Sequence, residues 1–108
     1  MILTALPGYP DLIGRRQAYV GYGSGPSSYS QTTGDVLIVP GYERYIDCIL
    51  EATQDPTGTY YAVARPSVVG PRATWVLHWF NASNSVEVTN GTNLSTYSLQ
   101  IALFLGEY

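Results

Sequence analysis

The chain's single histidine, His78, is the first residue to consider for chemistry, and it lies between Leu77 and Trp79. An imidazole commonly serves as a general base when a nucleophile and an orienting acid stand next to it. No nucleophile-elbow motif accompanies His78, although a triad assembled from distant positions is an open alternative. We interpret His78 as a structural residue on a sheet face, and we expect that the protein is not an enzyme and has no catalytic residues.

The remaining residue types do not support metal or acid–base sites. One histidine and one cysteine, Cys48, do not supply the ligand set of a zinc site, and Cys48 lies in an apolar run typical of a buried thiol. Asp47 and Glu51 fall on one strand face, but four residues of strand span about 13 Å, which is too far for paired carboxylates. We therefore predict no cofactor and no metal.

Charge and aromatic content indicate a binding or assembly role instead. Only 12% of the residues are charged, lysine is absent, and there are ten tyrosines. Protein interfaces are poor in lysine and glutamate and rich in tyrosine and arginine, so we expect much of this surface to be covered in use. The net charge of −3 argues against nucleic acid as a partner. No apolar run approaches the roughly 18 residues of a membrane helix, and no basic leader precedes one, so we expect cytoplasmic synthesis and no membrane partner.

Period-two patterns predict the elements that must position any site. Tyr45 to Thr53 alternates, Asp55-Pro56-Thr57-Gly58 has the residues of a type I turn, and Thr59 to Arg65 returns, so we predict a hairpin. Ala73 to Asn81 is bulky on both faces, which indicates a central strand covered on both sides. Tyr97 to Leu105 places its larger aliphatic residues on one face. In the first strand of the predicted hairpin, Tyr45 to Thr53, one face is predicted to hold Ile46, Cys48, Leu50 and Ala52.

The whole pattern predicts a single all-β domain over residues 1–108, with seven or eight short strands and no helix. The fold class we expect is an antiparallel β-sandwich spanning residues 35–108, with a small β-barrel as the alternative. Residues 1–34 differ, because they contain several prolines and the run Gly21-Tyr22-Gly23-Ser24-Gly25. That run lacks the lysine of a phosphate-binding loop and indicates flexibility. We predict that residues 1–34 form an extended arm or loops.

Four segments carry a further indication, namely Gly34 to Pro40, Asp55 to Tyr61, Trp75 to Phe80, and Asn90 to Ser95 with the final hydrophobic strand. Together they resemble the small β-sandwich proteins of tailed bacteriophage virions, over residues 34–108. The resemblance implies a capsid decoration or cement protein, or a small head, neck or tail component, with the capsid surface of the virion as the favoured location. It also implies the major capsid protein or other virion proteins as partners, extended arms that reach neighbours, and a homo-oligomer, with a trimer favoured.

A decoration protein would bind through aromatic and arginine residues, which dominate the binding energy of interfaces. The candidates on the arm and in the nearby loop are Tyr9, Arg15, Arg16, Tyr19, Tyr22, Tyr29, Tyr42 and Arg44. The alternative function is a carbohydrate- or receptor-binding module of a phage tail or fibre, in which exposed aromatic faces stack on sugars. Tyr60 and Tyr61 motivate this alternative, because adjacent residues of a strand face opposite sides.

Overall fold

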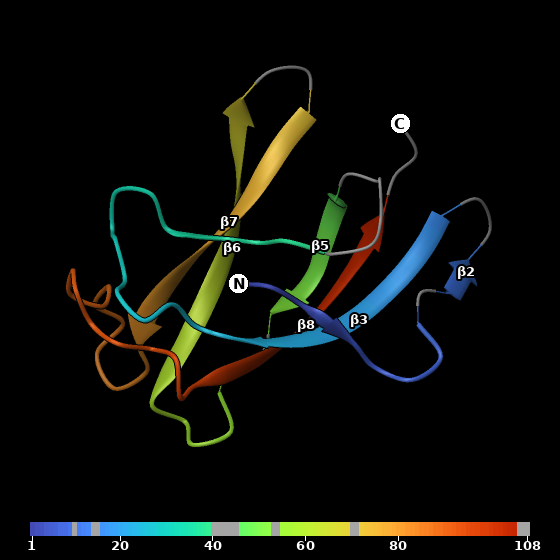
Figure 1. The fold of residues 1–108 in the computed structure, drawn as a ribbon. Helices are drawn as coiled ribbons and strands as arrows, with labels where there is room; N and C mark the ends of the chain where they lie inside the picture. Colours follow the sequence, from blue (N-terminus) through green and yellow to red (C-terminus); the bar gives the residue numbers. More distant parts are fainter. Residues whose placement is uncertain (10, 14–15, 40–45, 53–54, 70–71, 106–108) are drawn as a thin grey trace.

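A computed structural model describes residues 1–9, 11–13, 16–39, 46–52, 55–69 and 72–105 of the chain (Figure 1). Within these ranges the protein is all-β, contains no helix, and forms two antiparallel sheets. The strands are β1 (Thr4–Ala5), β2 (Asp11–Ile13), β3 (Arg16–Ser24), β4 (Asp35–Val36), β5 (Ile46–Ala52), β6 (Tyr60–Val69), β7 (Arg72–Asn81) and β8 (Ser98–Leu105). One sheet has the order β1-β3-β8-β5, with β2 also paired to β3, and the other has the order β4-β7-β6. None of the described residues forms a helix long and apolar enough to cross a membrane.

A single core connects the two sheets, and strand alternation places its residues. The aliphatic face predicted for β8 is buried, since the pattern along this strand alternates between buried and partly exposed positions. The β4-β7-β6 sheet contributes Leu77 and Trp79 of β7 to this core. Both side chains are fully buried, as their predicted shared face indicates. The prediction that β7 is central is also confirmed, because β4 and β6 flank it. Its outer face is only partly covered, because Thr74 is exposed and His78 is half-buried.

Residues 1–34 do not form the predicted extended arm, since they supply β1, β2 and β3 to the larger sheet. β3 pairs with β8 from Gln17–Leu105 to Ser24–Ser98, and β1 and β2 lie along its other edge. The glycines that indicated flexibility have a packing role instead. A Cβ on Gly21 would lie 2.6 Å from the ring of Tyr19, and one on Gly23 would lie 2.5 Å from Cγ of Met1. Glycine at these positions lets larger neighbours cross the strand surface.

The predicted hairpin of residues 45–65 is wrong in its pairing, although its turn forms. β5 pairs with β8 in one sheet, whereas β6 pairs with β7 in the other. The turn itself is held by Asp55, which accepts the amide hydrogen of Gly58 on its carbonyl at 2.9 Å and that of Tyr60 on its carboxylate at 2.6 Å. Turn chemistry is local, so it reverses the chain without deciding which strands become partners.

The alternation predicted for Tyr45 to Thr53 is also interrupted. Irregularities in the register occur between Ile46 and Cys48 and between Ile49 and Glu51. As a result Ile46, Ile49 and Ala52 lie opposite Leu105, Leu103 and Ile101 of β8. A β-bulge adds one residue to one strand, so every residue beyond it changes face relative to a strict period of two.

The chain start joins the two sheets along one edge. Ile2 forms a parallel bridge with Ile38, which follows β4. The amide of Leu3 donates to the carbonyl of Ile38 at 2.9 Å, and the amide of Ile38 donates to the carbonyl of Met1 at 2.9 Å. We call residues 1–5 together with residues 35–39 the seam (Figure 1).

Candidate functional site

The outward face of the seam carries a set of exposed apolar side chains. Ile2 and Ile38 are opposite each other in the bridge, and Val36 is two residues from Ile38, so these three share a face. Tyr22 joins them because it lies opposite Thr4, which is two residues from Ile2. The side chains are 65% exposed at Ile2, 48% at Ile38, 47% at Tyr22 and 40% at Val36. We call these four residues the apolar stripe.

The inward face of the seam is buried and includes a paired charge. Met1, Leu3 and Leu37 belong to the hydrophobic core. Asp35 is also buried, and its carboxylate accepts a hydrogen bond from the indole Nε1 of Trp79 at 3.1 Å and one from the amino group of Met1. A buried charge is tolerated only when it is paired and hydrogen-bonded, so these contacts hold the seam closed from the inside.

An open groove adjoins the stripe, with a volume of about 440 Å³. Ile2 and Tyr22 of the stripe line it, together with Thr4, Ser24 and Pro26. Its size falls within the range of small-molecule pockets, roughly 300–1,000 Å³. The groove therefore gives the stripe a concave neighbour that can accept a protruding group.

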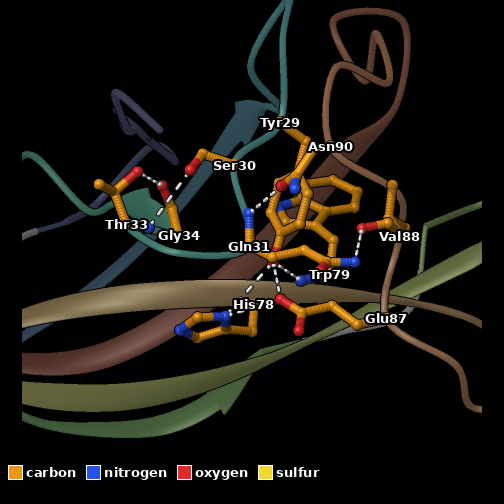
Figure 2. Close-up of polar contacts among 10 residues, drawn as sticks. All are labelled: Tyr29, Ser30, Gln31, Thr33, Gly34, His78, Trp79, Glu87, Val88 and Asn90. Carbon is orange, nitrogen blue, oxygen red and sulfur yellow. Dashed lines mark hydrogen bonds and ion pairs between the residues drawn. The ribbon is translucent and has the colours of Figure 1, made fainter.

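A separate polar cluster lies beside β7 and consists of Tyr29, His78 and Glu87 (Figure 2). The hydroxyl of Tyr29 donates to Oε2 of Glu87 at 2.7 Å, and Nδ1 of His78 lies 2.9 Å from the same oxygen. The Tyr29 hydroxyl also accepts the backbone amide hydrogen of Trp79 at 3.0 Å. Figure 2 shows these side chains converging, and they come from the segment before β4, from β7 and from the segment that follows β7.

The Tyr29 hydroxyl fills an interruption in the pairing along one edge of β7. Asp35 and Val36 pair with residues 76–77 of β7, and Glu87 bridges to Phe80 further along the same strand. Between these pairings, the amide of Trp79 has the Tyr29 hydroxyl as its acceptor. An unpaired buried amide is costly, so Tyr29 stabilises the edge where no strand reaches it.

The electrostatics of the cluster are those of a satisfied network. The bond from His78 and then the bond from Tyr29 hold the pKa of the Glu87 carboxyl below its ordinary value. Burial, followed by the bond to Glu87, raises the pKa of the Tyr29 hydroxyl well above its ordinary value. A phenol with a raised pKa, such as that of Tyr29, is a poor nucleophile. The loop at Gly34 lies close to the other ring nitrogen of His78, because a Cβ added at Gly34 would lie 3.2 Å from Nε2. The arrangement can orient an imidazole, but its contacts are those of a structural clasp.

Bonds on either side of the cluster extend this clasp. The amide of Tyr29 donates to the carbonyl of Thr92 at 2.9 Å. Gln31 donates its backbone amide to Oδ1 of Asn90 at 2.7 Å and its side-chain Nε2 to the carbonyl of Val88 at 2.9 Å (Figure 2). Residues 29–31 are thus tied to residues 87–92. Among the described residues, no group of three or more metal-ligating side chains occurs.

The structure separates the residues predicted to contact a partner. Tyr22 belongs to the apolar stripe, and Tyr9 is exposed elsewhere. Tyr19 and Tyr29 are buried in the core, so they are not accessible on an arm, and this part of the prediction is corrected. Arg16 begins β3 opposite Ile13, while Arg15, Tyr42 and Arg44 lie outside the described residues.

Sequence reasoning missed Ile2, Val36, Ile38 and Glu87. A signal for the first three was present, because the segments 2–3 and 36–39 are runs of consecutive apolar residues, which in a strand would make both faces apolar. Such a segment is either covered on both sides or has one face available for a partner. Glu87 had no comparable signal, because its partners lie 9 and 58 residues away.

Comparisons of the chain with protein-family models, with curated proteins and with solved structures find no match. The chain's own residues define an all-β protein that has a satisfied polar clasp on β7 and an uncovered apolar stripe on its seam.

Proposed function

We propose that this chain is a structural protein of a bacteriophage virion, of the capsid decoration or cement type, that acts through protein–protein contacts. The observation that carries the proposal is the uncovered apolar stripe on a chain with 12% charged residues and no lysine. Contiguous exposed apolar patches mark interaction sites more often than isolated exposed residues do. The virion setting comes from the resemblance of residues 34–108 to small phage β-sandwich proteins.

We also propose that the two sheets are the layers of a β-sandwich, joined along one edge by the seam. In such a layered domain the inner faces form the core, and a partner must bind an edge or an outer face. The seam presents an outer face, because the stripe lies there beside an open groove.

The proposed partner is the major capsid protein or another virion protein. Tyr22, at the groove, is the predicted contact residue that best fits this role, because interface hot spots are rich in tyrosine. Tyr9 and the four predicted contact residues Arg15, Arg16, Tyr42 and Arg44 remain part of the proposal.

Immunogold electron microscopy tests this function. An antibody raised against the purified protein would be applied to tailed virions from the source of the gene. We expect gold on the capsid surface, and mass spectrometry of the purified particles should detect the chain. Labelling confined to tail fibres would replace the decoration role with a tail role, and absence from purified particles would reject the virion proposal.

Carbohydrate binding is the second candidate, and the groove is the observation that favours it. Tyr22 offers an aromatic face next to the hydroxyls of Thr4 and Ser24, which is the combination that sugar sites use. A glycan array with the wild type and with Tyr22→Ala decides the matter. Binding that disappears in Tyr22→Ala supports a sugar site, and no binding by the wild type rejects it.

A further inference from the structure

We infer that the apolar stripe is a self-contact, on which two copies of this chain pack about a two-fold axis. The inference rests on the proposed function, since it names one partner of the contact surface. In a two-fold contact the same patch is used by both copies, so the patch must be complementary to itself. Ile2, Ile38, Val36 and Tyr22 carry no charge, so no like charges would oppose each other across such a contact.

The apolar stripe carries no charged group, and this permits a second copy of the chain to pack on it. Charged groups in an interface select a particular partner and suppress wrong ones. The stripe has no such group, and although Asp35 and Met1 line the adjoining groove, both are buried and their charges are paired with each other. An uncharged stripe can face its own copy with no like-charge repulsion.

The area of the stripe fits a small homodimer. The exposed fractions of its four residues correspond to roughly 400 Å² of surface, so two copies would bury roughly 800 Å² of stripe in total. Homodimer interfaces are about 65% apolar, which implies a whole interface of about 1,200 Å². That value lies at the lower limit for specific interfaces, about 1,200–2,000 Å², so we expect a dimer that dissociates on dilution.

The shape of the surface agrees with this arrangement. Ile2 and Ile38 are side by side in the bridge and form the middle of the stripe, with Tyr22 beyond Ile2 and Val36 beyond Ile38. With the axis near the bridge, the isoleucines of the two copies meet at the centre. The groove beside Tyr22 then gives room for a side chain of the second copy.

Sedimentation equilibrium of the full chain, from low micromolar to about 1 mM, tests the inference. The variants are Ile38→Ser on the stripe and Val86→Ser as the matched control, since Val86 is an exposed aliphatic residue outside the stripe. We expect a monomer–dimer equilibrium in the wild type, a dissociation constant at least tenfold higher in Ile38→Ser, and no change in Val86→Ser. Circular dichroism and urea unfolding of each variant establish that its fold is retained.

Ile2→Cys provides a second measurement that does not depend on affinity. A two-fold axis near the bridge brings the two engineered thiols together, so oxidation should give a covalent dimer on a non-reducing gel, whereas Val86→Cys should not. Three results would overturn the inference. They are a wild type that stays monomeric, a stable trimer, and equal weakening of the dimer by Ile38→Ser and Val86→Ser. A monomer found in virions would reject the self-contact and keep the virion role, and a dimer absent from virions would do the reverse.

Discussion

The two faces of the seam have similar composition but different surroundings. The inward face carries Met1, Leu3 and Leu37, which are buried in the core, and the outward face carries Ile2 and Ile38, which are exposed. Both faces are apolar, although a half-buried strand normally alternates apolar and polar residues. Hydrophobicity alone therefore does not mark the core here, and the exposed outward face is the surface on which the proposed contact depends.

The polar groups follow the same division. On the inward side, Asp35 has its carboxylate bonded to Trp79 and Met1. On the outward side, the exposed residues of the seam are Ile2, Val36 and Ile38 of the apolar stripe, together with Thr4. The inward face should therefore determine stability, and the outward face should determine association.

Asp35→Asn should have the largest effect on stability. It leaves the buried amino group of Met1 without its counter-charge, and breaking a buried ion pair costs about 3–5 kcal/mol. Urea unfolding followed by tryptophan fluorescence measures the loss. A change below about 1 kcal/mol would show that the inward charge pair is not important for closing the seam.

Leu3→Ala and Ile2→Ala compare adjacent residues on opposite faces. Leu3 is in the core, so its truncation should cost about 2–5 kcal/mol through lost burial and a cavity. Ile2 is exposed, so its truncation should change the free energy of unfolding of the monomer by about 0.5 kcal/mol or less. The measurement is urea unfolding at a concentration where the chain is monomeric. Equal costs at the two positions would remove the contrast between the faces.

Tyr29→Phe tests the clasp on β7. The variant keeps the buried ring but leaves the amide of Trp79 without its acceptor and removes one of the two bonds to Glu87, at a cost of about 1–3 kcal/mol. Tyr22→Phe is the matched control, because it removes a hydroxyl from an exposed ring and should be nearly neutral. Hydrogen exchange of the Trp79 amide should accelerate in the first variant alone. Unchanged exchange would contradict the role assigned to the Tyr29 hydroxyl.

Acid should weaken the same clasp, with the smallest effect of the series. The pKa of Glu87 is lower in the folded protein than its ordinary value, so its contribution is present above that value and is lost as pH falls through the folded value. Between about pH 5 and pH 3 the wild type should lose more stability than Glu87→Gln. Unfolding curves at several pH values give the comparison. Parallel losses in the wild type and Glu87→Gln would show that the carboxylate is not linked to folding.

Several elements could be predicted from the sequence because their signals are local. The buried faces of β7 and β8 follow from alternation, and the turn at Asp55 follows from the residues Asp-Pro-Thr-Gly. The pairing of β5 with β8 could not be predicted, because the turn reverses the chain whichever sheet the next strand joins. The candidate site was predicted only at Tyr22, since burial of Tyr19 and Tyr29 depends on segments distant in sequence.

By itself, the sequence determined that the described residues form an all-β fold and which faces of the strongest strands are apolar. Only the tertiary structure decided which apolar faces are covered. Residues 1–5 meet residues 35–39 through a bridge that spans 36 positions of the chain, and this contact buries one face of the seam and leaves the stripe outside. The physical reason is that a period of two assigns side chains to faces, whereas long-range pairing assigns faces to the core or to the solvent.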